Sequence, residues 1–187
     1  MPQPLAATDR PQEERLFVAV ELAEKLREQL YGLQSREIQR LKWSANLHLT
    51  LRFIGQVSPE RAELIRQCLR QTQSGPFVLT IAGLGLFKRR TGGLLWAGAH
   101  KTPALENLKQ QVDQALLAAG LNFAPEDYFP HITLSRMKKP VPLLLKKTVS
   151  EKASARFGEM TVTEFILFRS LLRPSGAIHE PVEKYRL

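Results

Sequence analysis

The chain has 187 residues, enough for one large domain or two small lobes. A hydrophobic content of 43% supports a packed core and excludes a globally disordered chain, and no apolar run reaches membrane-spanning length. The net charge of +9 and the pI near 10.0 favour an anionic partner such as RNA or a phosphorylated metabolite, although a basic surface that merely keeps the protein soluble would give the same charge. The single cysteine, Cys68, excludes an internal disulfide.

The start of the chain differs from the rest in composition. Residues 1–14 contain three prolines and mixed charge, without the basic start and apolar stretch of a secretory signal peptide. We therefore expect a flexible leader over residues 1–14, followed by a single domain over residues 15–187. We expect this domain to lie in the cytoplasm and to make no contact with a membrane.

From residue 15 on, short apolar segments alternate with amphipathic ones. Segments rich in aliphatic and β-branched residues predict strands, and apolar residues every three or four positions predict helices. Ser58-Pro59 and Thr102-Pro103 each place a hydroxyl before a proline, which is typical of a helix start. In chain order we expect a strand at 15–20, a helix at 22–41, a strand at 46–55, a helix at 58–71, a strand at 77–81, a basic glycine-rich turn at 88–93, a strand at 94–98, a helix at 102–119, a strand at 129–136, an unassigned segment at 143–150, one or two strands at 157–170 and a last strand at 178–187.

One four-residue pattern occurs twice in the chain. It is present as His48-Leu49-Thr50-Leu51 and again as His131-Ile132-Thr133-Leu134, and these copies hold two of the four histidines. Both copies read His-aliphatic-Thr-Leu inside a predicted strand. Because alternate residues of a strand share a face, each copy presents one imidazole and one hydroxyl together, while the aliphatic residues point into a core.

The segments around the two motifs also repeat. Residues 16–20, a helix and the first motif parallel residues 94–98, a helix and the second motif. Two similar lobes related by a pseudo-twofold axis would bring the two motif strands together. This arrangement would place the two imidazoles across one cleft.

Two opposed imidazoles suit acid–base chemistry near neutral pH. One can take a proton from an attacking water while the other gives a proton to a leaving oxygen. The threonine hydroxyls are suited to donating hydrogen bonds to a charged oxygen. Cleavage or transfer of a phosphodiester without a metal meets these constraints. A metal site is less favoured because no carboxylate or thiol recurs at ligand spacing, and the repetition disfavours two merely structural histidines.

These residues resemble the 2H phosphoesterases, a family named for two His-x-Thr/Ser-x motifs. Within that family they are most similar to the RNA 2′,3′-cyclic phosphodiesterases, formerly called bacterial 2′-5′ RNA ligases. The last strand departs from the family pattern, because it reads Ile178-His179-Glu180 where relatives commonly have an aromatic residue before the Glu. Besides the two motifs, the resemblance includes Phe17-Val18-Ala19-Val20, Trp43, Phe87 with Arg89 and Arg90, Leu95-Trp96-Ala97-Gly98, Pro130 and Arg136 around the second motif, and Ser170 ahead of Gly176.

The resemblance implies a bilobal α+β fold in which antiparallel sheets line a central cleft and helices lie outside. It implies hydrolysis of an RNA terminal 2′,3′-cyclic phosphate to a 2′-phosphomonoester without metal or cofactor, and the reverse 2′-5′ joining reaction. Carried over, His48 would be the proton donor to the leaving 3′-oxygen and His131 the proton acceptor that activates water. Thr50 and Thr133 would hold phosphate oxygens. Arg136 would add charge at the phosphate, although strict alternation puts it on the face opposite His131.

Some alternatives stay open on the sequence. The near symmetry of the motifs leaves the donor and acceptor unassigned by the residues themselves. A non-catalytic RNA-binding module, or a 2H phosphodiesterase acting on a small cyclic nucleotide, would keep the same motifs. We expect a monomer without an obligate protein partner. Lys88-Arg89-Arg90 either binds RNA phosphates or forms a solvated turn; Trp43 and Phe17 are either core residues or a stacking face for a base; His100 and His179 are expected to be structural.

Overall fold

The computed structural model describes residues 13–33, 41–174 and 176–187. The first strand begins at Glu14, the last residue of the predicted leader, and residues 1–12 lie outside the described residues. Among the described residues, no helix is long and apolar enough to cross a membrane. The elements are β1 (Glu14–Glu21), α1 (Glu24–Tyr31), β2 (His48–Val57), α2 (Pro59–Leu69), β3 (Phe77–Arg89), β4 (Gly92–Ala99), α3 (Pro103–Ala118), β5 (His131–Met137), α4 (Leu143–Glu151), β6 (Arg156–Val162), β7 (Glu164–Arg173) and β8 (Gly176–Arg186).

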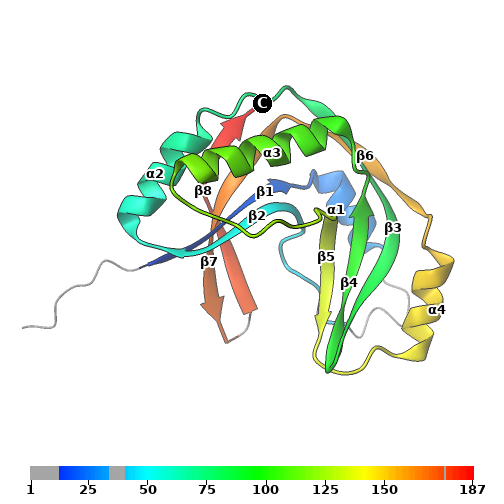
Figure 1. Ribbon diagram of the computed structural model, residues 1–187. Helices are drawn as coiled ribbons and strands as arrows, with labels where there is room; N and C mark the ends of the chain where they lie inside the picture. Colours follow the sequence, from blue (N-terminus) through cyan, green and yellow to red (C-terminus); the bar gives the residue numbers. More distant parts are fainter. Residues whose placement is uncertain (1–12, 34–40, 175) are drawn as a thin grey trace, which may run out of the picture.

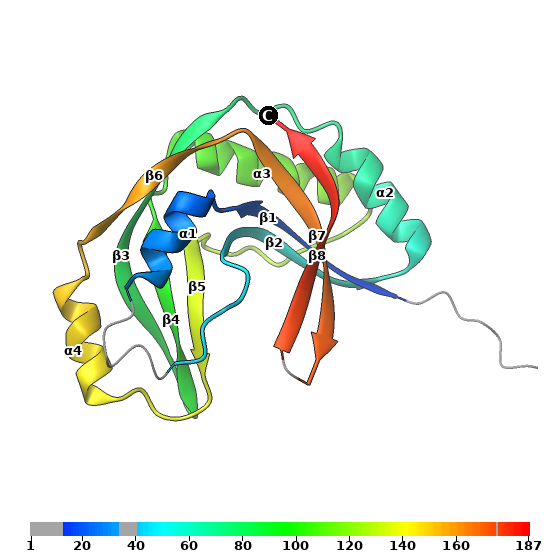
Figure 2. The ribbon, with the colours of Figure 1, turned by 180° about the vertical axis from the view of Figure 1, so that it is seen from behind.

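The strands form one curled antiparallel sheet, shown from two sides in Figures 1 and 2. Its order is β6-β3-β4-β5-β2-β1-β7-β8, so the two motif strands, β2 and β5, lie at its centre. A single residue pair, Leu49 with Ile132, joins them. Each lobe therefore contributes four strands, and the expected bilobal α+β fold is confirmed, with the sheets of the two lobes continuous through that pair.

The helices tie the two lobes together. α1 follows β1 in the chain but packs against β6 in the opposite lobe, and α3 follows β4 but packs against α2 and β2. α4 packs against β3. Figure 1 shows α2 and α3 side by side above the β1–β2 half, and Figure 2 shows α1 over the β3–β4 half. Each lobe is thus covered partly by a helix whose preceding strand belongs to the other.

The two predicted helix starts are confirmed. The Ser58 side chain accepts a hydrogen bond from the backbone N–H of Arg61 at the start of α2. The Thr102 side chain accepts one from the backbone N–H of Leu105 at the start of α3. In both helices the next residue is proline, whose missing N–H costs nothing in the first turn.

Two helical segments differ from the prediction. The predicted helix over 22–41 is confirmed over α1, which ends before Gly32, and residues 34–40 lie outside the described residues. The unassigned segment 143–150 forms α4, in which Leu145 and Val149 are buried. Their spacing of four residues places both side chains on one face of the helix.

The strand predicted at 77–81 continues to Arg89, so Lys88 and Arg89 belong to β3 rather than to the turn. The strand passes through a bulge between Ala82 and Leu84. Gly83 lies in this bulge with a φ of +76°, and a Cβ there would come within 2.7 Å of the Ala153 carbonyl oxygen. Glycine is therefore required at the position that the sequence had suggested as a bend.

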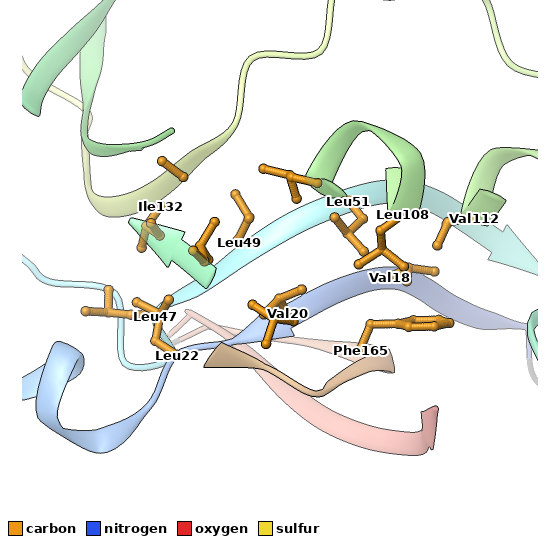
Figure 3. Close-up of a cluster of buried hydrophobic side chains, with 14 of the residues drawn as sticks. Val18, Val20, Leu22, Leu47, Leu49, Leu51, Leu108, Val112, Ile132 and Phe165 are labelled. Carbon is orange, nitrogen blue, oxygen red and sulfur yellow. The ribbon is translucent and has the colours of Figure 1, made fainter. Parts of the chain in front are cut away.

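The main core lies between the sheet and the helices (Figure 3). The aliphatic residues of both motifs point into it, and Leu49 and Ile132 lie side by side there. Leu108 and Val112 of α3 cover the same region. A second, smaller cluster consists of Phe17, Ala19, Ile166 and Phe168 on β1 and β7. Because these residues alternate with main-core residues, they lie on the other face of the sheet, the face of His48 and His131.

Candidate active site

The two motifs meet at the centre of the sheet. His48 is the first residue of β2 and His131 is the first residue of β5. Continuing the antiparallel register by one residue on either side of the central pair places His48 opposite Thr133 and Thr50 opposite His131. All four side chains lie on the face opposite the main core. The sequence prediction that the two motifs come together is confirmed, and the pseudo-twofold axis passes through the central pair.

Both imidazoles are anchored in the same way. The Nδ1 atom of His48 lies 3.0 Å from the carbonyl oxygen of Asn46, and that of His131 lies 2.8 Å from the carbonyl oxygen of Phe129. A carbonyl oxygen can only accept, so each Nδ1 carries a proton and donates it. Each Nε2 atom is then the one that gains or loses a proton.

Aromatic rings surround His48 on the first lobe. The ring centroids of Phe17 and His179 each lie about 5 Å from it, at 5.1 Å, and that of Phe168 lies 6.3 Å away. Phe17 stacks on Phe168 at 5.2 Å, so the two rings form an apolar floor under the imidazole. This floor is the smaller hydrophobic cluster on β1 and β7.

Burial lowers the pKa of His48 to about 4. The positive charges of His179, Arg136 and His131 lower it further, against the hydrogen bond with Asn46, which raises it. Desolvation and like charges both disfavour the charged imidazolium. In the empty site, His48 is therefore neutral at neutral pH.

A matching set of rings surrounds His131 on the second lobe. Its ring centroid lies 5.2 Å from Phe87, 6.0 Å from Phe129 and 6.4 Å from Trp96. The indole of Trp96 lies directly over Gly85, where a Cβ would come within 1.9 Å of it. The glycine therefore makes room for the indole. Phe87 and Phe129 remain 38% and 49% exposed, so the site offers apolar surface to a ligand on this side.

A bulge in β5 decides the position of Arg136. Thr133 pairs with Trp96 and Ser135 with the preceding residue of β4, which leaves Leu134 as the extra residue. Leu134 and Ser135 are both buried, and alternation resumes one step out of phase. Arg136 thus returns to the face of the histidines. The expectation from strict alternation, which placed it on the opposite face, is wrong because of this bulge.

The charge of Arg136 is felt across the site. It adds to burial in lowering the pKa of both His48 and His179. These three groups come from β5, β2 and β8, so one guanidinium acts on imidazoles of the other lobe. A cation held among neutral imidazoles favours an anionic ligand.

β2 carries the same bulge, but with different chemistry. Thr50 pairs with Ala19 and Arg52 with the preceding residue of β1, which leaves Leu51 as the extra residue. Phe53 is therefore the counterpart of Arg136. It is 62% exposed, and its ring lies 5.9 Å from that of Phe17. The backbone is nearly symmetric, whereas the site carries a guanidinium on one side and a phenyl ring on the other.

The two motif threonines are partly buried. In the part of the chain that the structure describes, neither hydroxyl forms a hydrogen bond with another protein group. The backbone oxygen of Thr50 accepts a hydrogen bond from the Tyr128 hydroxyl at 3.2 Å, which fixes the strand rather than the side chain. Both hydroxyls of Thr50 and Thr133 remain available as donors to a ligand.

His179 belongs to the site, and the sequence-based expectation that it is structural overlooked this position. Its place depends on two strand pairings, β7 with β1 and β8 with β7, which no local pattern reveals. His100, by contrast, is exposed at the end of β4. Trp43 packs against the main core and bridges to Ser135, which agrees with the core interpretation of this residue.

The cavities outside this face have their own occupants. A cavity of about 680 Å³ lies between α3 and residues 121–128. Its polar wall consists of Arg52, Lys109, Asp113 and Glu126, which pair with one another. A second cavity of about 570 Å³ lies along the ends of β1, β2 and β7. Within the described ranges, no group of three or more potential metal ligands occurs.

Comparison with known proteins identifies the family. The family model of the 2′-5′ RNA ligase superfamily matches residues 16–173. The chain belongs to this superfamily. An RNA 2′,3′-cyclic phosphodiesterase of Methanothermobacter thermautotrophicus is 34% identical over 183 residues, which cover 92% of this chain and 98% of that relative. The resemblance drawn from the two motifs is therefore confirmed.

Solved structures give the same assignment. LigT of Escherichia coli in its apo form is 26% identical and superposes with a TM-score of 0.76 over 94% of this chain and 98% of LigT. LigT in complex with phosphate is 25% identical, with a TM-score of 0.72 over 94% of this chain and 98% of that chain. The curled sheet and its helices are thus those of this superfamily.

Proposed function

We propose that this protein hydrolyses the terminal 2′,3′-cyclic phosphate of RNA to a 2′-phosphomonoester, with His48 and His131 as an acid–base pair. The proposal rests on one observation above all. Two imidazoles, each with Nδ1 held by a backbone carbonyl, begin adjacent central strands on the same face of the sheet. Membership of the superfamily and the name of the Methanothermobacter relative support it.

The reaction requires one proton acceptor and one proton donor. The oxygen of a water molecule forms a bond to phosphorus while the bond from phosphorus to the 3′-oxygen breaks. His131 takes the proton of the water at Nε2, and His48 gives a proton from Nε2 to the 3′-oxygen. In the reverse direction, with a ribose hydroxyl in place of water, the two roles exchange and a 2′-5′ linkage forms.

The donor role requires His48 to be protonated, although its pKa in the empty site is about 4. A bound phosphate places a negative charge beside the ring and raises that pKa. The donor is therefore charged when the substrate enters the site. If the anion failed to do this, His48 would act as the acceptor instead and His131 as the donor.

The remaining site residues stabilise charge. Thr50 and Thr133 donate hydrogen bonds to the non-bridging oxygens, whose negative charge grows in the transition state. Arg136 lies on the same face and supplies a permanent positive charge. These groups can perform the reaction with water as the only co-substrate, so we propose a mechanism without metal or cofactor.

Two features favour RNA over a small cyclic nucleotide. The chain carries a net charge of +9, which attracts a polyanion. Exposed rings flank the two imidazoles on both lobes, with Phe53 on one side and Phe87 and Phe129 on the other. Such rings stack on bases without regard to sequence.

The test is the hydrolysis of an oligonucleotide that ends in a 2′,3′-cyclic phosphate, in the presence of EDTA. We expect turnover to a 2′-phosphate by the wild type and a loss of at least about 10³-fold in His48→Gln and in His131→Gln. His100→Gln is the matched control and should keep full activity. A wild type that binds the oligonucleotide without turning it over would instead support the binding-module alternative.

A further inference from the structure

A third imidazole lies in the site without a role in the reaction described above. The ring of His179 on β8 lies 5.1 Å from that of His48 and 4.8 Å from that of Phe17, edge-on to both. In the sheet, His179 pairs with Ser170 of β7, two residues beyond the Phe168 of the apolar floor. His179 therefore extends the wall on which His48 stands.

The His179 ring has an unsatisfied nitrogen. Its Nδ1 atom is buried and has no hydrogen-bond partner among the described residues. In this it differs from the motif histidines, whose Nδ1 atoms are both held by carbonyls. No protein group therefore fixes which of the two nitrogens of His179 carries the proton. A buried polar atom without a partner is costly unless a ligand or the group's function explains it.

The neighbours of His179 leave it neutral in the empty site. Burial lowers its pKa, and the charge of Arg136 on β5 lowers it further. Phe17 of β1 and Ser170 of β7 carry no charge, and His48 of β2 is an imidazole that its own pKa keeps neutral. Arg169 and Glu180 pair with each other at 2.9 Å and belong to the adjacent positions on the other side of the strands.

We propose that His179 is a third phosphate-binding imidazole, which takes up a proton when the scissile phosphate enters and then donates a hydrogen bond to one of its oxygens. This inference rests on the proposed function, since it uses the same site and the same substrate. In the empty site, His48 and His179 compete for a proton, because two imidazolium ions this close repel each other. The phosphate removes the repulsion between them and Arg136, and both rings can then be charged.

The proposal makes His179 a binding residue rather than an acid or a base. It contacts the phosphate in the ground state and in the transition state alike, so its loss raises KM and leaves kcat nearly unchanged. A purely structural role predicts a different pattern. A ring that only fills space beside Phe17 would be replaced by phenylalanine without a change in KM.

The first experiment compares His179→Phe and His179→Gln with the wild type on the cyclic-phosphate oligonucleotide. We expect the phenylalanine variant to raise KM roughly tenfold or more, with kcat within about threefold. The glutamine variant keeps an N–H donor without the charge and should lie between the two. His100→Gln is the control. A wild-type KM in the phenylalanine variant, with an unchanged unfolding temperature, would overturn the proposal.

The second experiment measures proton uptake and needs no activity. Calorimetric titration with sulfate, whose charge is constant above pH 5, is run at pH 7 in two buffers of different ionisation enthalpy. Wild type and His100→Gln should take up protons as the anion binds, and both His179 variants should take up fewer. Equal uptake in all four proteins would refute the role assigned to His179.

The two experiments separate this inference from the proposed function. If the wild type does not hydrolyse the cyclic phosphate, the proposed function fails, and the sulfate titration still reports on His179. If the wild type is active and the His179 variants match it in both KM and proton uptake, the proposed function stands and the inference is wrong.

Discussion

At the scale of single residues, the site is built from two imidazoles held by backbone carbonyls of their own segments. The carbonyl that holds each ring belongs to the residue two positions earlier, Asn46 for His48 and Phe129 for His131. This contact sets the tautomer of each ring without help from a distant carboxylate. The motif therefore carries its own orienting group, which explains why the sequence pattern alone located the site.

The threonine hydroxyls provide the first prediction at this scale. Thr50→Val and Thr133→Val keep the side-chain shape and remove one donor to a charged oxygen. We expect each substitution to lower kcat about 10²-fold and to leave the free energy of unfolding within about 1 kcal/mol of wild type. The control is Thr161→Val, at an exposed position of β6. Full activity in both motif variants would remove the threonines from the mechanism.

The buried state of His48 provides the second. Its pKa is about 4 in the folded protein against 6.5 for an ordinary imidazole. Between these two values the unfolded chain binds more protons than the folded one, so stability falls as the pH is lowered from 6.5 to 4. The loss should reach up to about 3 kcal/mol and should disappear in His48→Gln. Urea unfolding at several pH values measures it, with His100→Gln as control. An identical pH dependence in His48→Gln and wild type would contradict the shift.

The residues that sequence reasoning found and missed differ in one respect. His48, Thr50, His131 and Thr133 share two short motifs, and strand periodicity alone places each pair on one face. His179 enters the site through the pairing of β8 with β7 and of β7 with β1. Such long-range pairing is invisible in a local pattern, so no motif could have revealed it.

At the scale of elements, two bulges shape the site. The bulges at Leu51 and Leu134 lie at equivalent positions of β2 and β5 and shift the residues that follow to the other face. They bring Phe53 and Arg136 to the histidine side and turn Arg52 and Ser135 inward. Alternation predicted the first half of each strand correctly and failed after the bulge, because a bulge leaves no local signal in these segments.

The inward arginine holds α3 and the loop that leads into the second motif. Arg52 is 8% exposed and forms two hydrogen bonds of 2.7 Å with Asp113 of α3. It also pairs with Glu126, before β5, at 2.7 Å. Arg52→Met should lower the free energy of unfolding by roughly 3 kcal/mol, because it leaves two carboxylates with Lys109 as their one remaining described partner. Urea unfolding measures the change.

An exposed pair offers the matched control for this substitution. Arg70 and Glu183 also form a two-point contact, at 2.6 and 2.9 Å, but the arginine side chain is half exposed. Arg70→Met should therefore cost less than about 1 kcal/mol. Equal losses for the two substitutions would show that burial of the Arg52 pair does not matter.

At the scale of the whole molecule, the two lobes share one sheet and exchange helices. The repeat of strand, helix and motif predicted two related lobes, and the β1–β2 and β4–β5 pairs confirm it. The register aligns Val20 with Ala97, because each pairs with the motif residue after the histidine, a shift of one residue from a simple comparison of the two segments. The crossing of α1 and α3 between lobes could not be predicted, since helix periodicity does not say which sheet a helix covers.

The net charge of +9 provides the prediction at this scale. If the substrate is RNA, KM for a cyclic-phosphate oligonucleotide should rise with salt more steeply than KM for the cyclic mononucleotide. Removing charge from the turn between β3 and β4, with Lys88→Gln and Arg90→Gln together, should reduce the logarithmic salt slope by about 1. Lys146→Gln, on α4, is the control. Equal slopes for the two substrates would favour the small cyclic nucleotide.

The most direct test of the two-histidine mechanism is the pH dependence of hydrolysis of the cyclic-phosphate oligonucleotide in EDTA. The mechanism predicts a bell-shaped profile for the wild type, with the 2′-phosphate as product. The pH at which activity falls on the basic side should be higher for kcat than for kcat/KM, because the bound anion raises the pKa of His48. Flat profiles, activity that needs a metal, or wild-type rates in His48→Gln or His131→Gln would contradict the mechanism.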